Sequence, residues 1–288
     1  STPYSMQLNT GVERLISKDV TVRADYLWTR GTHLLRTRNT NLFAPLLTPG
    51  GGLIFRQNRL DPRFDAIDLL ESSASSSYNG LTLSLTKRLS DEFELLGSYT
   101  LSKTIDDASD FDEQPQNPYN LHAERSLSRQ DMRDRFVVNA LFDLPIGEDE
   151  KDRGKSRTDQ GLLTKLFGHI EAAPIFTLSS GRPVNALTGG DEERSRAFPF
   201  ASRPFGFGRN TARTPNFINV DLRIVKYFPY GETRRLDFAV EAFNMLNHPN
   251  VLVINSFYGS GPVPLPSFGA PAAFAAPRQI RFSIDFEY

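Results

Sequence analysis

The sequence has 288 residues, of which 39% are hydrophobic and 23% are charged, and its formal net charge is -1. This length suits one large domain or two ordinary ones, and the balanced charge gives no reason to expect nucleic acid as a partner. Cysteine is absent, which excludes disulfide scaffolds, thiolate zinc sites and cysteine nucleophiles. The sequence contains no run of about 18 apolar residues, so it encodes no transmembrane helix. A membrane β-barrel is still allowed, because its apolar and polar residues alternate.

The first half of the chain contains four segments in which apolar and polar residues alternate, the pattern of a two-faced strand. They lie near residues 4–16, 20–29, 78–89 and 93–101. Tight polar turns join the first to the second and the third to the fourth. Between these pairs runs a long irregular stretch, residues 31–77, in which residues 64–70 are expected to form a short helix.

Five further segments alternate in the same way, near residues 136–144, 170–178, 218–228, 236–242 and 278–288. Pro174 lies inside the second of these five, where it removes one backbone donor from the ladder. The last segment reads RQIRFSIDFEY and ends on an aromatic residue. A closing strand of this kind is typical of a transmembrane β-barrel.

The connections between these nine strands alternate in length: short, long, short, long, medium, long, short, long. In an up-and-down meander, successive connections fall on opposite rims. Outer-membrane barrels have short periplasmic turns and long external loops, and the observed order puts every long loop on one rim. We therefore predict an all-β fold, an antiparallel up-and-down meander of about nine strands that forms part of a larger transmembrane barrel.

The alternation also divides the wall residues into two sets. The polar set, expected to face a hydrated or plug-filled lumen, consists of Arg23, Asp25, Arg135, Asp221, Arg223, Asp237, Glu241, Arg281 and Asp285. The apolar set, expected to face lipid, consists of Val220, Leu222, Phe238, Val240, Ile280, Phe282, Ile284 and Phe286. Charges of both signs in mid-strand would each cost several kcal/mol in a small dry interior unless they were paired, which favours a wide barrel.

Bacterial single-chain barrels have even strand numbers, whereas nine is odd. Residues 1–15 also show neither the basic segment nor the apolar segment of a signal peptide. We therefore expect this chain to be part of a longer precursor that begins partway round a larger barrel. On this interpretation the first strand is an interior one, and the closing strand keeps one unpaired edge.

Several segments together resemble one family, the TonB-dependent outer-membrane receptors of the Oar-like group, which carry a carboxypeptidase-regulatory-like N-terminal domain. The matching stretches are ESSASSSYNGLTLSLTKRLS, SYTLSKTIDDASD, ERSLSRQDMRDRFVVNALFDLPIG, FTLSSGRPV, GRNTARTPNFINVDLRIVKYF, LDFAVEAFNMLNHPN and PRQIRFSIDF. They follow one another in order from Glu71 onward.

The resemblance implies a 22-stranded barrel in the bacterial outer membrane, plugged from within, that takes up a large substrate with inner-membrane energy. Residues 1–288 would be the C-terminal part of such a barrel, with the plug and the N-terminal domain absent. The implied partners are outer-membrane lipid and, in the full-length protein, its own plug and the TonB energy-coupling system. The identity of the extracellular substrate is not implied.

No motif in the chain favours catalysis. His33, His122, His169 and His248 lack metal-ligand spacing, and no serine lies in a G-x-S-x-G motif. Residues 206–209 are not expected to bind phosphate, and Asp237 and Glu241 are expected to be wall residues rather than an acid-base pair. We expect no enzyme activity, no cofactor and no metal site.

Two charged loops have alternative interpretations. The loop with Asp106, Asp107, Asp110, Asp112 and Glu113 has oxygen ligands suited to Ca²⁺, although a solvated acidic loop is the favoured interpretation. Arg182, Arg194, Arg196, Arg203, Arg209 and Arg213 make another loop basic. It is expected to be hydrated, with contact to lipopolysaccharide phosphates or an anionic ligand as the alternative.

Two other functions are left open beside transport. One is a structural or adhesion protein of the outer membrane that binds an extracellular partner through its long loops. The other is a soluble all-β carbohydrate-binding or hydrolytic domain, which would purify without detergent.

Overall fold

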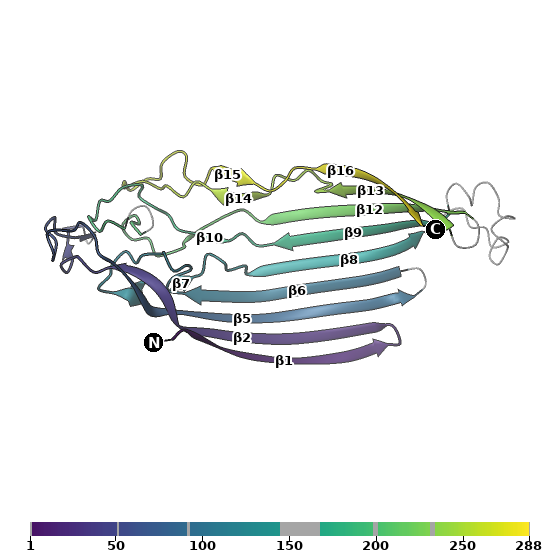
Figure 1. The fold of residues 1–288 in the computed structure, drawn as a ribbon, viewed down its shortest axis with the longest axis horizontal. Helices are drawn as coiled ribbons and strands as arrows, with labels where there is room; N and C mark the ends of the chain where they lie inside the picture. Colours follow the sequence, from purple (N-terminus) through teal and green to yellow (C-terminus); the bar gives the residue numbers. More distant parts are fainter. Residues whose placement is uncertain are drawn as a thin grey trace.

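The computed structural model describes residues 2–50, 52–90, 93–144, 168–197, 201–230 and 234–287. Nine long strands form one antiparallel sheet in which each strand lies beside the next long strand of the chain (Figure 1). They are β1 (Tyr4–Ser17), β2 (Val20–Asn39), β5 (Asp68–Ser90), β6 (Phe93–Asp106), β8 (Asp134–Leu144), β9 (Ile170–Ser179), β12 (Phe217–Tyr230), β13 (Arg234–Phe243) and β16 (Gln279–Glu287). The predicted all-β antiparallel meander of about nine strands is confirmed.

Shorter elements lie in the long connections. β3 (Leu46–Leu47) pairs with β4 (Leu53–Ile54), β10 (Pro183–Val184) with β11 (Ala212–Arg213), and β14 (Val251–Ile254) with β15 (Pro271–Phe274). β7 (Ser126–Leu127) pairs with the end of β6 and follows a single 3₁₀ turn, η1 (Leu121–Glu124). These elements gather at the left end of the sheet in Figure 1. In the part of the chain that the structure describes, no helix has the length and apolar character needed to cross a membrane.

The turn between β1 and β2 lies at the opposite end, where the last described residues of β5 and β12 and the first of β6 and β13 also lie, as the alternation of connection lengths predicts. The connection of medium length, between the strands predicted at residues 136–144 and 170–178, falls mainly on residues 145–167, which lie outside the described residues. Within the described chain, β1 pairs only with β2, and β16 pairs only with β13. The sheet thus has two edge strands and does not close on itself.

The short helix predicted for residues 64–70 is wrong. β2 and β5 continue to pair beyond a bulge at residues 31–34, up to the partners Asn39 and Asp68, so residues 68–70 are extended. His33 has a left-handed backbone at this bulge, with φ of 57°. The stretch before β5 is held by amide side chains, since Asn41 Nδ2 donates to the carbonyl oxygen of Phe64 at 2.6 Å. Hydrogen bonds between strands that are distant in sequence therefore satisfy the backbone N–H and C=O groups of residues 68–70, although the local sequence alone would also allow a helix.

Pro174 is accommodated inside β9 by a gap in one ladder. β9 pairs continuously with β12, and Pro174 lies opposite Leu222. On its other side β9 pairs with β8, and this ladder is interrupted. Asn139 is paired with Ile175 and Phe142 with Ala172, but the residues between them have no partners in the register. The missing N–H of the proline therefore interrupts only the ladder with β8.

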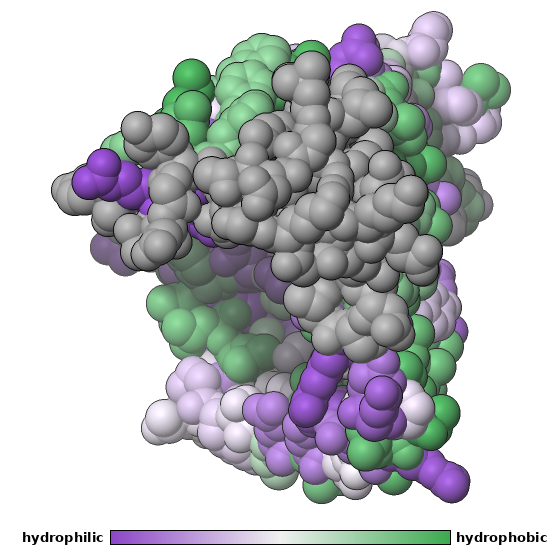
Figure 2. Space-filling view, turned by 90° about the vertical axis from the view of Figure 1, so that its right-hand side faces the viewer, coloured by the Kyte–Doolittle hydropathy of each residue, from purple (hydrophilic) through white to green (hydrophobic). Residues whose placement is uncertain are grey.

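Each face of the sheet keeps one character across successive strands, apart from Phe217, which lies on the polar face at the start of β12. Ala24, Leu83, Tyr99, Phe136, Leu178 and Ile218 form one row of register partners, and Asp25, Thr82, Thr100, Arg135, Ser179 and Phe217 form the adjacent row on the other face. The apolar face is open, since Leu83 is 46% exposed and Phe282 is 66% exposed. Figure 2, viewed from the short-turn end, shows hydrophobic residues along much of the right-hand outline.

Candidate functional site

The best-packed part of the molecule is formed by the long connections rather than by the sheet. We call it the loop assembly and define it as the described residues of the ranges 40–67, 107–133, 180–216 and 244–278. Leu42, Phe55, Ala186 and Ala201 are each at most 1% exposed within it. Many of its buried side chains are polar or charged, so the assembly depends on specific hydrogen bonds as well as on apolar burial.

Arg209 lies at the centre of one buried network and is 1% exposed. Its Nε donates to Glu113 Oε1 at 2.8 Å, and its Nη2 donates to Glu113 Oε2 at 3.0 Å and to Asp106 Oδ1 at 2.7 Å. Nη2 also donates to the Ser109 hydroxyl, while Nη1 donates to the carbonyl oxygens of Asp106 and Glu124. The guanidinium thus joins its own loop to the end of β6 and to the loop that follows β6, which lie 85 to 103 residues away in sequence.

The charged groups in this network shift one another's pKa values. Burial acts to raise the pKa of Glu113, but the hydrogen bonds and positive charge of Arg209 outweigh it and hold that pKa below its ordinary value. Burial likewise acts to lower the pKa of Arg209, and the two carboxylates reverse this, so its pKa is raised. Both groups are therefore charged at neutral pH, and each compensates the other's loss of hydration.

A second buried pair lies beside the first. Arg203 donates from Nη1 and Nη2 to the two carboxylate oxygens of Glu124, at 2.7 and 2.9 Å. Gln116 donates its backbone N–H to Glu124 and its side-chain amide to Glu193 Oε1. Burial raises the pKa of Glu193 to about 7, since the Gln116 hydrogen bond and the charge of Arg203 offset the burial only in part. Its other oxygen, Oε2, is buried without a hydrogen-bond partner.

These contacts correct two expectations for the charged loops. The acidic loop is not simply solvated, because Asp106 and Glu113 are 3% and 7% exposed and bind Arg209. The basic loop is not simply hydrated, because Arg203 and Arg209 are buried against carboxylates. The described residues contain no group of three or more histidines or carboxylates that could hold a metal ion. Opposite charges in distant loops pair with each other, which neither loop's own sequence reveals.

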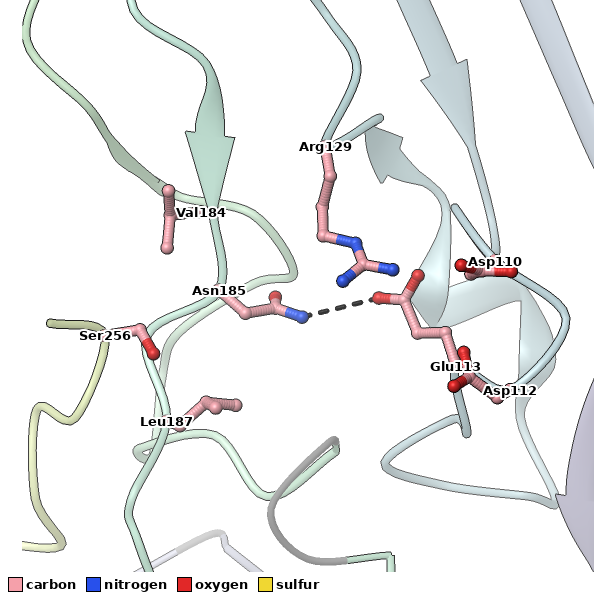
Figure 3. A pocket seen from close by; sticks show the side chains of 8 residues that line it. All are labelled: Asp110, Asp112, Glu113, Arg129, Val184, Asn185, Leu187 and Ser256. Carbon is pink, nitrogen blue, oxygen red and sulfur yellow. Dashed lines mark hydrogen bonds between the residues drawn. The ribbon is translucent and has the colours of Figure 1, made fainter. Parts of the chain in front are cut away.

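Cavities open between the loops. One of about 240 Å³ is lined by Asp110, Asp112, Glu113, Arg129, Val184, Asn185, Leu187 and Ser256 (Figure 3). The Asn185 amide points across it and donates to Glu113 Oε1 at 3.4 Å. A second cavity of about 350 Å³ has Glu193, Arg203, Phe205 and Phe207 in its lining. A third, of about 430 Å³, lies where the loop assembly meets the sheet and includes Arg135.

The sequence-derived polar set lies on one face of the sheet and forms short ion-paired groups there. Arg23 Nε is 2.6 Å from Asp25 Oδ2. Arg223 and Arg281 flank Glu241 from the two neighbouring strands, at 3.9 and 3.8 Å. The remaining members stand apart from these groups: Asp237 contacts Arg235, Asp221 accepts the Asn244 N–H, Asp285 lies opposite Asp237, and Arg135 lines the third cavity.

The sequence-derived apolar set occupies the opposite face of β12, β13 and β16. Members of the set lie next to apolar residues on the adjacent strands. Leu222 and Ile280 lie on either side of Ala242, Val240 lies beside Phe282, Phe238 beside Ile284, Leu236 beside Phe286, and Val220 beside Phe176. The rings of Phe238 and Phe282 stack with centroids 6.3 Å apart. Ile280, Phe282, Ile284 and Phe286 are each more than half exposed.

The chain's sequence matches the family described as an outer membrane beta barrel domain, over residues 1–205 and 195–281. No curated protein matches it. Its fold is similar to that of the outer membrane transporter YddB from Escherichia coli, with a TM-score of 0.59 and 10% identity over 100% of this chain and 33% of that one. It is also similar to Pseudomonas aeruginosa FpvA bound to heterologous pyoverdines, with a TM-score of 0.52 and 10% identity over 99% of this chain and 27% of that one. The chain spans a third or less of these structures.

Proposed function

The chain belongs to the outer-membrane β-barrel domain family, and on this basis we propose that it supplies nine neighbouring strands to the wall of a TonB-dependent receptor of the Oar-like group. In this proposal residues 1–288 are the C-terminal part of a larger barrel that takes up a large substrate across the bacterial outer membrane. The family membership removes the soluble carbohydrate-binding hypothesis. The proposal includes no covalent chemistry.

The observation that carries the proposal is the two-faced sheet whose long connections, as far as the structure describes them, pack together at one end. Leucine, isoleucine and phenylalanine side chains cover one face and remain exposed, which would be costly in water and is favourable against lipid chains. We place this face towards lipid and the ion-paired face towards the aqueous interior. The loop assembly then lies outside the cell, where it makes the first contact with a substrate.

The fold similarity to an outer membrane transporter supports transport as the activity. We further propose that the full-length protein carries a plug and binds the TonB energy-coupling system. The direct test is capture of the full-length protein, in detergent, on the immobilised periplasmic domain of TonB. Capture that is lost when the residues before the plug are deleted supports coupled uptake, and absence of capture from the intact protein contradicts it.

One observation favours an adhesion role as a second candidate. Leu47, Phe205 and Val263, all in the loop assembly, are 75%, 70% and 72% exposed. Exposed apolar side chains at a loop surface suit contact with another macromolecule. An adhesion protein would bind its extracellular partner equally well in cells with and without TonB, whereas uptake through the proposed receptor requires TonB.

A further inference from the structure

The 430 Å³ cavity joins the wall to the loop assembly. Arg135 of β8, Ser179 of β9 and Phe217 of β12 are register partners on the polar face and line it from the sheet side. Arg182 and Leu252 line it from the loops. With Met132, three long strands and three separate loops thus contribute to one concave site.

Positive charge in this cavity is uncompensated. Arg135 and Arg182 line it, and none of its lining residues is acidic. Within the described chain neither guanidinium has a hydrogen-bond or ion-pair partner, unlike those of Arg203 and Arg209. The carboxylate next to Arg135 is Asp134, which belongs to the opposite face of the strand and accepts the Tyr99 hydroxyl at 2.6 Å.

The next acid before Asp134 along the chain is also engaged. Asp131 is fully buried, accepts the backbone N–H of Thr104 at 2.7 Å and lies 3.6 Å from Arg213. The local carboxylates therefore do not neutralise the two cavity arginines. Two guanidinium groups that line one cavity open to solvent repel each other, and a bound anion would relieve that repulsion.

The rest of the lining sets the character of the anion. Hydroxyl groups of Thr177, Ser179 and Ser180 provide further donors, while Met132, Phe217 and Leu252 provide an apolar wall. We propose that this cavity binds a solute with a phosphate or carboxylate group on an apolar or aromatic body. The anionic group lies between Arg135 and Arg182, and the body lies against Phe217 and Leu252.

This inference rests on the proposed uptake function, because it places the solute on the polar face, immediately beneath the external loops. It specifies the substrate chemistry that the barrel accepts at that level. A lipid headgroup is the less suitable source of the anion, since the apolar face of the same strands lies on the other side of the sheet.

The test uses the full-length protein in zwitterionic detergent, with phenyl phosphate and benzoate as anionic probes and benzamide as their neutral counterpart. Binding is measured by titration calorimetry at low and at high salt. We expect phenyl phosphate or benzoate to bind more tightly than benzamide and more tightly than inorganic phosphate. We also expect salt to weaken the binding of the anions.

The variants Arg135→Gln and Arg182→Gln should each weaken anion binding about tenfold or more, since each removes a charge-assisted hydrogen bond. Arg135→Lys, which keeps the charge, should retain most of the affinity. Arg194→Gln, which changes an exposed arginine outside the cavity lining, should bind like the wild type. Heat-modifiable gel migration verifies that each variant is folded.

Equal affinity in the wild type and both glutamine variants, or a wild type that binds no anionic probe, would overturn the inference. Either result would leave TonB capture unaffected, so failure of the cavity assignment is distinguishable from failure of the uptake proposal. If lipopolysaccharide added to the detergent competes with phenyl phosphate, the anion chemistry stands but its source is a lipid. Absence of competition assigns the cavity to a diffusible solute.

Discussion

Replacing Arg209 with methionine tests whether the loop assembly depends on its buried charges. Methionine keeps most of the apolar length of the side chain but removes six hydrogen bonds to Asp106, Ser109, Glu113 and Glu124. Two carboxylates, 3% and 7% exposed, lose their cation. Breaking a buried ion pair from one side costs about 3–5 kcal/mol, so local opening of the loops should become more frequent by roughly a hundredfold to a few thousandfold.

Hydrogen exchange of backbone amides in the full-length protein measures this opening. The amide of Ser109, which donates to Glu113 Oε2 at 2.6 Å, reports on the network directly. Amides in the middle of β5 should keep their protection, because the sheet ladder is independent of this contact. Arg194→Met is the matched control, since Arg194 is exposed on the same loop. If both variants exchange at the wild-type rate, the buried network does not hold the loops together.

Three further predictions follow from the same contacts. The pKa of Glu193 is about 7 in the folded loops, against an ordinary value of 4.5. The free energy of opening of the wild-type loops should therefore fall by about 3 kcal/mol as the pH rises from 4.5 to 7, and should level off above pH 7. Glu193→Gln should abolish this decline, which a pH series of hydrogen exchange measures. Leu83→Arg should impair assembly by about 2–4 kcal/mol, seen as lost heat-modifiable migration, whereas Thr82→Arg on the opposite face should assemble. Gly181→Ala places a Cβ 1.7 Å from the carbonyl oxygen of Thr214 and should disorder this loop in limited proteolysis, whereas Gly50→Ala meets open space and should not.

The sheet was predictable from sequence because alternation is a local signal. Each long strand carries the period-two pattern through its membrane-length part, so nine strands and their order followed from reading the chain alone. What was missed lies beyond that part. β2 extends to Asn39 and β5 begins at Asp68 because these ends pair with each other past a bulge. The composition of residues 64–70 allows a helix, and only the distant partner decides against it.

The loop assembly was not predictable for a related reason. Arg209 and Glu113 are 96 residues apart, and each lies in a loop that, read alone, resembles a hydrated charged segment. The two loops carry opposite charge, which is the one sequence signal that anticipates their pairing. Charge complementarity does not specify which residues meet, however, and the cavity between Arg135 and Arg182 arises only when a strand end and a loop come together in three dimensions.

The central claim is that the sheet is a membrane wall with its apolar face towards lipid and its polar face towards water. Residues 1–288 contain no cysteine, so a single introduced cysteine is the one labelled position once any cysteine elsewhere in the full-length protein has been replaced by serine. We would label positions 81–86 of β5 one at a time in the full-length protein in bilayers and measure collision with oxygen and with a water-soluble nickel chelate. The account predicts oxygen maxima at Leu81, Leu83 and Leu85 and nickel maxima at Thr82, Ser84 and Thr86. Profiles that rise and fall together, or that do not alternate, would contradict it.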